Sequence, residues 1–150
     1  MKKLLFILLV SIGLTFGAKA QNTTYVQLGV STGFNVLNGT VELGVESGKH
    51  RLAAVGQSFD KANQSRTYFV GGKYGRIFND AIGDFNLVAS LAAKVNVNYT
   101  EQVIVEPGLA LEALFGRGVS LVTGLSAPVI HTSGNNDFTL GGNLGLRINL

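Results

Sequence analysis

The chain offers one pair of residues whose types and spacing suit covalent catalysis, His131 and Ser133. On an extended strand, residues i and i+2 share a face, so the histidine could take the proton of the serine hydroxyl and make it a nucleophile. A carboxylate would have to orient the imidazole, and Asp137 is the nearest one downstream. Asp137 follows Ser133 by only four residues, at the wrong distance for that role. The neighbouring Gly134-Asn135-Asn136 has ordinary loop composition, so the segment favours a plain loop over an active site.

Other kinds of chemical site find little support in the sequence. There is no cysteine, and His50 and His131 are too far apart, without a ligand at i+2 or i+4, to predict a metal site. The pairs Gly71-Gly72 and Gly141-Gly142 lie in strand-like segments and not in a phosphate-binding loop. We therefore expect no metal ion, no cofactor and no enzymatic activity.

The first twenty residues predict a cleaved secretory signal peptide. A basic start, Met1-Lys2-Lys3, precedes a mostly apolar run over residues 4–16 and the small-x-small sequence Ala18-Lys19-Ala20. The domain boundaries expected are thus 1–20 for the signal and 21–150 for a single folded domain. Cleavage removes three of the twelve Lys and Arg residues, which leaves nine against nine Asp and Glu and a net charge of zero. The basic pI of the full chain is therefore no reason to expect nucleic-acid binding.

Beyond residue 20, apolar and polar residues alternate with the period of two that indicates β-strands. The clearest run is the last one, in which Leu144, Leu146, Ile148 and Leu150 alternate with Asn143, Gly145, Arg147 and Asn149. We expect eight strands over about 24–34, 40–46, 51–59, 65–78, 85–97, 102–113, 119–129 and 138–150. The expected turns are 37–39, 47–50, 60–64, 79–83, 98–101, 116–118 and 131–136. Pro107 and Pro128 should each mark a bulge or a strand end. The faces of the third strand cannot be assigned from its weak pattern.

The aromatic residues favour an apolar face that points outward into a membrane. All but Phe69 fall near strand ends, as expected for two girdles at the interfaces of a lipid bilayer. One expected girdle contains Phe34, Phe59, Tyr68, Tyr99 and Phe138, and the other contains Tyr25, Tyr74, Phe78, Phe85 and Phe115.

The polar faces of the strands carry charges of both signs. These faces are short of charge for a surface in water, but they suit the interior of a small barrel, where buried charges must pair. The expected lumenal charge network consists of Glu42, Glu46, Lys73, Lys94, Glu106, Glu112 and Arg147. Eight strands enclose only enough room for side chains, so this interior predicts no diffusion pore. A soluble lipid-binding barrel with its apolar face inward is the alternative arrangement.

Together, the leader, the eight strands and the final Leu144–Leu150 alternation resemble the small OmpA/OmpX-type outer-membrane barrels of Gram-negative bacteria. The resemblance implies an all-β, eight-stranded, antiparallel up-and-down transmembrane β-barrel, which is porin-like in architecture and monomeric. The expected location is the outer membrane, where the barrel would contact lipid and both termini would lie in the periplasm. The expected role in the cell envelope is structural or one of interaction. Barrels of this kind are recognised by the assembly machinery through a last strand that usually ends in an aromatic residue, where this chain has Leu150.

His131-Thr132-Ser133 also resembles the His-x-Ser sequence of outer-membrane lipid A deacylases, which are eight-stranded barrels too. Those enzymes orient the histidine with a glutamate on the last strand, whereas this last strand has no carboxylate after Asp137. A lipid A-modifying hydrolase that uses His131 and Ser133 is thus the enzymatic alternative.

Overall fold

The computed structural model describes residues 22–34, 36–59, 66–99, 101–116 and 118–150. The signal peptide predicted over residues 1–20 lies outside the described residues. Among the described residues, no helix is long and apolar enough to cross a membrane. The described part is all-β, and its strands are β1 (Thr23–Gly33), β2 (Val36–Ser47), β3 (His50–Phe59), β4 (Thr67–Ile82), β5 (Phe85–Asn96), β6 (Val103–Phe115), β7 (Val119–Ser126), β8 (Val129–Thr132), β9 (Asn135–Phe138) and β10 (Gly141–Asn149).

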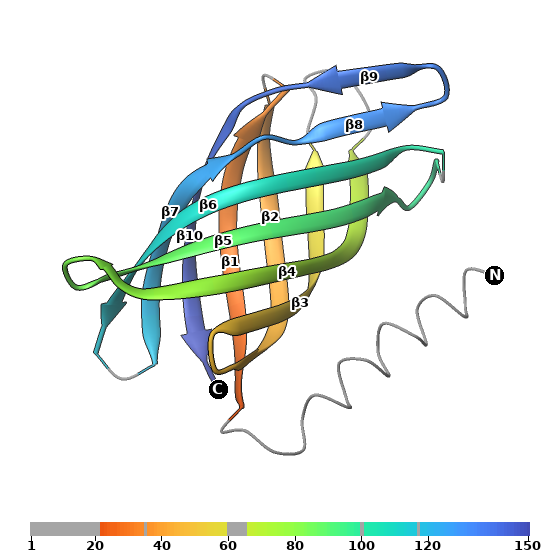
Figure 1. Ribbon diagram of the computed structural model, residues 1–150. Helices are drawn as coiled ribbons and strands as arrows, with labels where there is room; N and C mark the ends of the chain where they lie inside the picture. Colours follow the sequence, from red (N-terminus) through yellow and green to blue (C-terminus); the bar gives the residue numbers. More distant parts are fainter. Residues whose placement is uncertain (1–21, 35, 60–65, 100, 117) are drawn as a thin grey trace.

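Eight of these strands close into an antiparallel barrel (Figure 1). Strands β1 to β7 pair with their sequence neighbours, and β10 pairs with β7 on one side and with β1 on the other. The seam between β1 and β10 runs from the pair Tyr25 and Asn149 to the pair Ser31 and Asn143. Closure leaves none of the eight strands with an open edge along this seam. The predicted fold class, an eight-stranded antiparallel barrel, is confirmed at this level.

The two additional strands arise because the predicted seventh and eighth strands are each interrupted. The seventh becomes β7 and β8, which are separated at Ala127-Pro128, as expected for a proline that cannot donate to the ladder. The eighth becomes β9 and β10, so β8 and β9 form a hairpin above the rim (Figure 1). The prediction of a simple turn over 131–136 was therefore wrong, because only Ser133-Gly134 connect β8 to β9.

Two other predicted turns are displaced. Residues 37–39 lie within β2, because Gly33 pairs with Val36 and the chain reverses between them, where Phe34 has a φ of 53°. Most of the segment 79–83 belongs to β4, whose pairing with β5 shifts register between Phe78 and Ile82. The predicted turns at 47–50, 98–101 and 116–118 do separate strands, and residues 60–64 lie outside the described residues.

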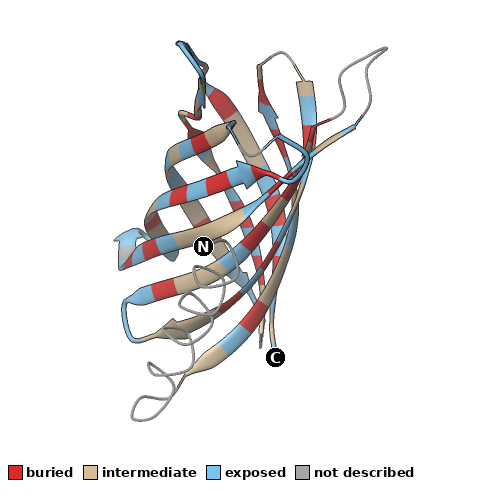
Figure 2. Ribbon diagram, turned by 90° about the vertical axis from the view of Figure 1, so that its right-hand side faces the viewer, coloured by how far each residue is buried: buried red, intermediate tan, exposed pale blue. Residues whose placement is uncertain are grey.

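Burial alternates along the strands and separates the two faces of the wall (Figure 2). Charged and amide side chains, among them Glu112 and Lys94, are buried inside the barrel, whereas leucines such as Leu28 and Leu146 are exposed outside. The chain thus does not adopt the arrangement of a soluble lipid-binding barrel, which would place its apolar faces inward.

Candidate functional site in the barrel interior

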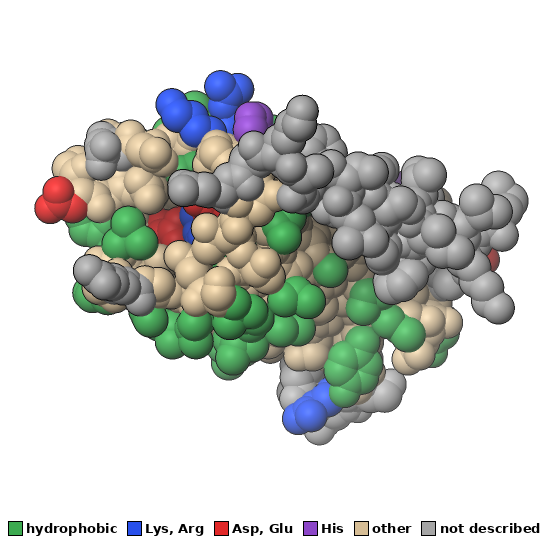
Figure 3. Space-filling view, turned by 90° about the horizontal axis from the view of Figure 1, so that it is seen from below, with side chains coloured by type: hydrophobic (Ala, Val, Ile, Leu, Met, Phe, Trp, Pro, Cys, Tyr) green, Lys and Arg blue, Asp and Glu red, His purple; other side chains and the backbone are tan. Residues whose placement is uncertain are grey.

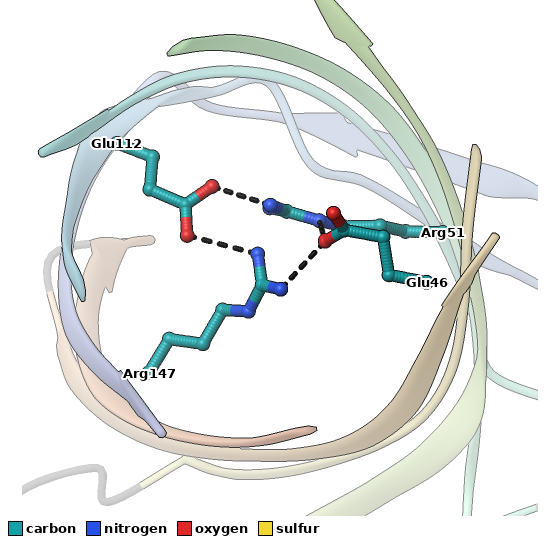
Figure 4. Close-up of polar contacts among 4 residues, drawn as sticks. All are labelled: Glu46, Arg51, Glu112 and Arg147. Carbon is teal, nitrogen blue, oxygen red and sulfur yellow. Dashed lines mark hydrogen bonds and ion pairs between the residues drawn. The ribbon is translucent and has the colours of Figure 1, made fainter. Parts of the chain in front are cut away.

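Two glutamates and two arginines form a closed ring of ion pairs inside the barrel (Figure 4). Arg147 donates to Glu112 over 2.8 Å and to Glu46 over 2.5 Å. Arg51 donates to Glu46 over 2.9 Å and also to Glu112. Each charged group therefore contacts both groups of opposite sign, and the four charges sum to zero. The side chains of Glu112 and Arg147 are almost fully buried.

This ion-pair ring lies at the end of the barrel where β1 begins and β10 ends. Glu46 and Arg51 come from the adjacent strands β2 and β3, whereas Glu112 and Arg147 come from β6 and β10, which are far from them in sequence. In the view from below, acidic and basic side chains show inside the wall (Figure 3).

Tyr25 packs against the ion-pair ring instead of facing outward. The guanidinium carbon of Arg147 lies 4.5 Å from the centre of the Tyr25 ring, in cation–π geometry. Gly44 makes room for this ring, because a Cβ on Gly44 would lie 2.7 Å from the tyrosine oxygen. The prediction that Tyr25 belongs to a membrane-facing girdle is therefore wrong, since its side chain is 2% exposed.

A second group of polar contacts occupies the middle of the barrel. Lys73 donates to Glu42 over 2.6 Å, and Lys94 donates to both Glu106 and Gln57. A cavity of about 60 Å³ is lined by the two lysines and their carboxylate partners together with small residues such as Ser31. Each lysine thus has a carboxylate partner, which offsets part of the cost of removing its charge from water.

The opposite end of the interior contains an apolar cluster, beside the buried amides of Asn38 and Asn96. Phe59 and Phe69 meet edge to face with their ring centres 5.1 Å apart, and Ile104 completes a buried cluster with them. Phe34 and Ile130 pack against this cluster. Phe34 and Phe59 were predicted to face the membrane, and that placement is wrong because both belong to the interior packing.

The remaining residues of the predicted girdles are exposed on the outside of the barrel or its rim. Their exposed fractions lie between 42% and 64%. They are Tyr68, Tyr74, Phe78, Phe85, Tyr99, Phe115 and Phe138. Their contact with a membrane interface stays a prediction.

All seven residues of the predicted charge network have side chains that take part in the interior contacts described above. The residue that sequence reasoning missed is Arg51, because the faces of β3 had not been assigned. A usable signal existed in the short turn at Gly48-Lys49. Such a turn pairs Ser47 with His50 and then Glu46 with Arg51, which places Arg51 on the same face as a predicted lumenal residue.

The predicted catalytic pair is not assembled for catalysis. The Ser133 hydroxyl donates to Glu101 over 3.0 Å, and Nδ1 of His131 lies 2.6 Å from the side-chain oxygen of Asn136. Both residues are exposed on the β8–β9 hairpin. Among the described residues, no group of three His, Cys, Asp or Glu side chains could hold a metal ion.

Comparisons with known proteins bear on the fold alone. No protein-family model matches the chain, and no curated protein matches its sequence. One designed transmembrane β-barrel superposes with a TM-score of 0.63 at 12% identity, over 89% of this chain and 98% of that chain. The designed barrel TMB2.3 gives a TM-score of 0.56 at 13% identity, over 88% and 98% of the two chains. Neisserial surface protein A gives 0.52 at 10% identity, over 86% and 96%. The chain is thus similar in fold to small barrels that cross membranes.

Proposed function

We propose that the chain is a small integral β-barrel of the bacterial outer membrane, with a closed interior and a structural or interaction role in the envelope. The observation that carries this proposal is the distribution of residue types between the two faces of one wall. Paired charges are buried inside, and the outer surface is largely aliphatic. A protein folded in water would gain stability from the opposite arrangement.

The outer surface supports a lipid environment. Leu28, Leu125 and Leu144 are 57%, 70% and 50% exposed, and each belongs to a different strand. Hydrophobic side chains gather along the outer wall in Figure 3. Soluble proteins rarely expose continuous apolar patches of more than a few hundred Å². The fold likeness to designed transmembrane barrels and to Neisserial surface protein A points the same way.

The packing of the interior supports the proposal that the barrel does not conduct solutes. The ion-pair ring lies toward one end and the cluster of Phe59, Phe69 and Ile104 lies toward the other. The cavity of about 60 Å³ between them has room for only a few water molecules. Solutes would have to displace buried ion pairs or close-packed rings in order to pass.

The enzymatic alternative, a lipid A-modifying hydrolase, receives less support. Its serine and histidine form hydrogen bonds with Glu101 and Asn136 respectively. Neither of these contacts activates a nucleophile. The fold neighbours named above also give no reason to expect an enzyme.

Assembly follows from the same proposal. The signal sequence would direct export, and β10 would be the strand that the barrel assembly machinery recognises. Leu150 belongs to the wall, because its backbone nitrogen donates to the carbonyl of Thr24 over 2.8 Å. With β1 and β10 paired along their length, the barrel needs no partner chain to close, which favours a monomer.

Cell fractionation combined with gel electrophoresis tests the proposal. The protein should be recovered with the outer membrane and should migrate differently in SDS before and after boiling, as closed barrels do. Planar bilayers that contain the folded protein should show no regular conductance steps. Recovery as a soluble periplasmic protein would overturn the proposal. A Ser133→Ala variant distinguishes the proposal from the enzymatic alternative. The hydrolase requires that this variant change the mass spectrum of lipid A, whereas the proposal expects no change.

A further inference from the structure

Three basic side chains gather outside the barrel, near the end that carries the ion-pair ring. Lys49, His50 and Arg76 are all exposed, and we refer to them as the basic rim. His50 of β3 and Arg76 of β4 are direct partners across the two strands. The carbonyl of Lys49 accepts a hydrogen bond of 2.8 Å from the backbone of Ile77, which fixes the turn beside β4. The view from below shows basic side chains beside a histidine at one side of this end (Figure 3).

Two exposed aromatic rings frame the basic rim. Tyr74 and Phe78 flank Arg76 on the outward face of β4, at positions i−2 and i+2. The guanidinium carbon of Arg76 lies 5.6 Å from the centre of the Phe78 ring. The Tyr74 hydroxyl lies 2.6 Å from Nδ1 of His50. Arg76 is therefore a cation on the apolar outer face, held at the level of aromatic residues that favour a membrane interface.

The charges of the basic rim lack a described counter-charge. Among the described residues, no carboxylate forms an ion pair with Lys49, His50 or Arg76. Lys49 and Arg76 carry charge of the same sign at this end of the barrel, so an external anion would stabilise the arrangement. A guanidinium binds phosphate oxygens through two parallel hydrogen bonds.

The surroundings favour a lipid over a free anion. Leu91 is the cross-strand partner of Tyr74 and is 52% exposed on the same outer face. A phosphate held by Arg76 would place its acyl chains over this apolar surface, where they would cover side chains such as Leu91 and Tyr74.

We propose that the basic rim binds the phosphate group of an anionic phospholipid. This lipid belongs to the leaflet at the end of the barrel that carries the ion-pair ring. This inference rests on the proposed membrane function. Arg76 supplies the main phosphate contact, Lys49 adds positive charge, the His50 imidazole offers a further hydrogen bond, and Tyr74 and Phe78 set the depth of the headgroup.

Native mass spectrometry of the folded, detergent-solubilised protein with added phosphatidylglycerol tests the inference. The wild-type protein should retain one phosphatidylglycerol more tightly than phosphatidylcholine. The Arg76→Gln variant should bind it about fivefold more weakly, the effect expected for one interfacial cation. Lys49→Gln, a change in an exposed turn, should weaken binding in the same direction. The matched control is Arg66→Gln, an exposed arginine just before the opposite end of β4, which should leave the affinity unchanged.

The same preparations separate this inference from the proposal on which it rests. If the variants keep the heat-dependent gel shift and insert into vesicles but bind phosphatidylglycerol as tightly as the wild type, the inference is wrong and the membrane barrel stands. If inorganic phosphate at equal concentration displaces the lipid, the site is a free-anion site and the inference is also overturned. If the wild-type protein does not enter vesicles at all, both fail.

Discussion

Replacement of Glu112 by glutamine would measure how much the ion-pair ring contributes to the stability of the barrel. Glu112 is 1% exposed and accepts hydrogen bonds from both Arg51 and Arg147. The ring carries two negative and two positive charges, so Glu112→Gln leaves a net charge of plus one in the interior. The glutamine keeps the shape of the side chain, and the change is therefore mainly electrostatic.

The expected loss of stability is large. Removing one partner of a buried ion pair typically costs about 3–5 kcal/mol, because the remaining charge stays buried without compensation. A single contact at 4 Å has a Coulomb energy of about 4 kcal/mol at an effective dielectric constant of 20, which is of the same size. With a urea dependence of about 2 kcal/mol per molar, the unfolding midpoint should fall by about 1.5–2.5 M.

Urea titration of the protein in phosphatidylcholine vesicles, followed by the heat-dependent gel shift, provides the measurement. The double variant Glu112→Gln/Arg147→Met restores a neutral ring and should be more stable than Glu112→Gln alone. Glu101→Gln is the control, because Glu101 is exposed and contacts Ser133 at the rim, so its effect should stay within about 0.5 kcal/mol. A loss below about 1 kcal/mol for Glu112→Gln would refute the reasoning, since it would mean that water screens the ring.

Three other changes test separate parts of the structure. Gly71→Ala should lower the yield of the heat-shifting form sharply, because a Cβ there would lie 1.9 Å from the carbonyl oxygen of Ala93; Gly75→Ala on the same strand, where the nearest atom is 3.4 Å away, should fold normally. Phe69→Ala should lower the free energy of unfolding by about 3–5 kcal/mol in the same urea titration, because it empties the centre of the apolar cluster. Leu150→Phe should accelerate assembly into the outer membrane if the assembly machinery recognises an aromatic residue at this position. The measurement is the rate at which the form with a heat-dependent gel shift appears in cells, and an unchanged rate would show that residue 150 does not affect this recognition.

The faces of most strands could be predicted from sequence because side chains on a regular strand alternate between the two faces of the sheet. Glu42, Lys94 and Arg147 share the polar face of their strands, and this face is the inner one. Tyr25 was misplaced because its position near a strand end was given more weight than the alternation of side chains. It has the same parity as Gln27 on the polar face, yet its position near a strand end suggested a girdle. The alternation of side chains along β1 turns Tyr25 inward, although the residue lies near the end of the strand.

The ends of the strands were less accessible to prediction than their partners. Pro128 marked an interruption correctly, and β8 keeps the partner and register that β7 has on β6, since Gly108 pairs with Ser126 and Val105 pairs with Val129. The interruption of the last predicted strand at Thr139-Leu140 has no comparable proline signal. The turn between β1 and β2 was misplaced for a related reason. Asn38-Gly39 has typical turn chemistry, but the register of the two strands makes the chain reverse earlier.

The ion-pair ring also has a consequence for how the barrel closes. Arg147 lies on β10, whose pairing with β1 completes the ring of strands. A slip of one residue along this seam would turn Arg147 toward the outer, apolar side and would bring the neighbouring Leu146 or Ile148 into the interior. The slipped barrel would then leave Glu46 and Glu112 each short of one partner. The correct register is thus the one in which all four charges are paired, so we expect the ring to select the closing register as well as to stabilise the closed barrel.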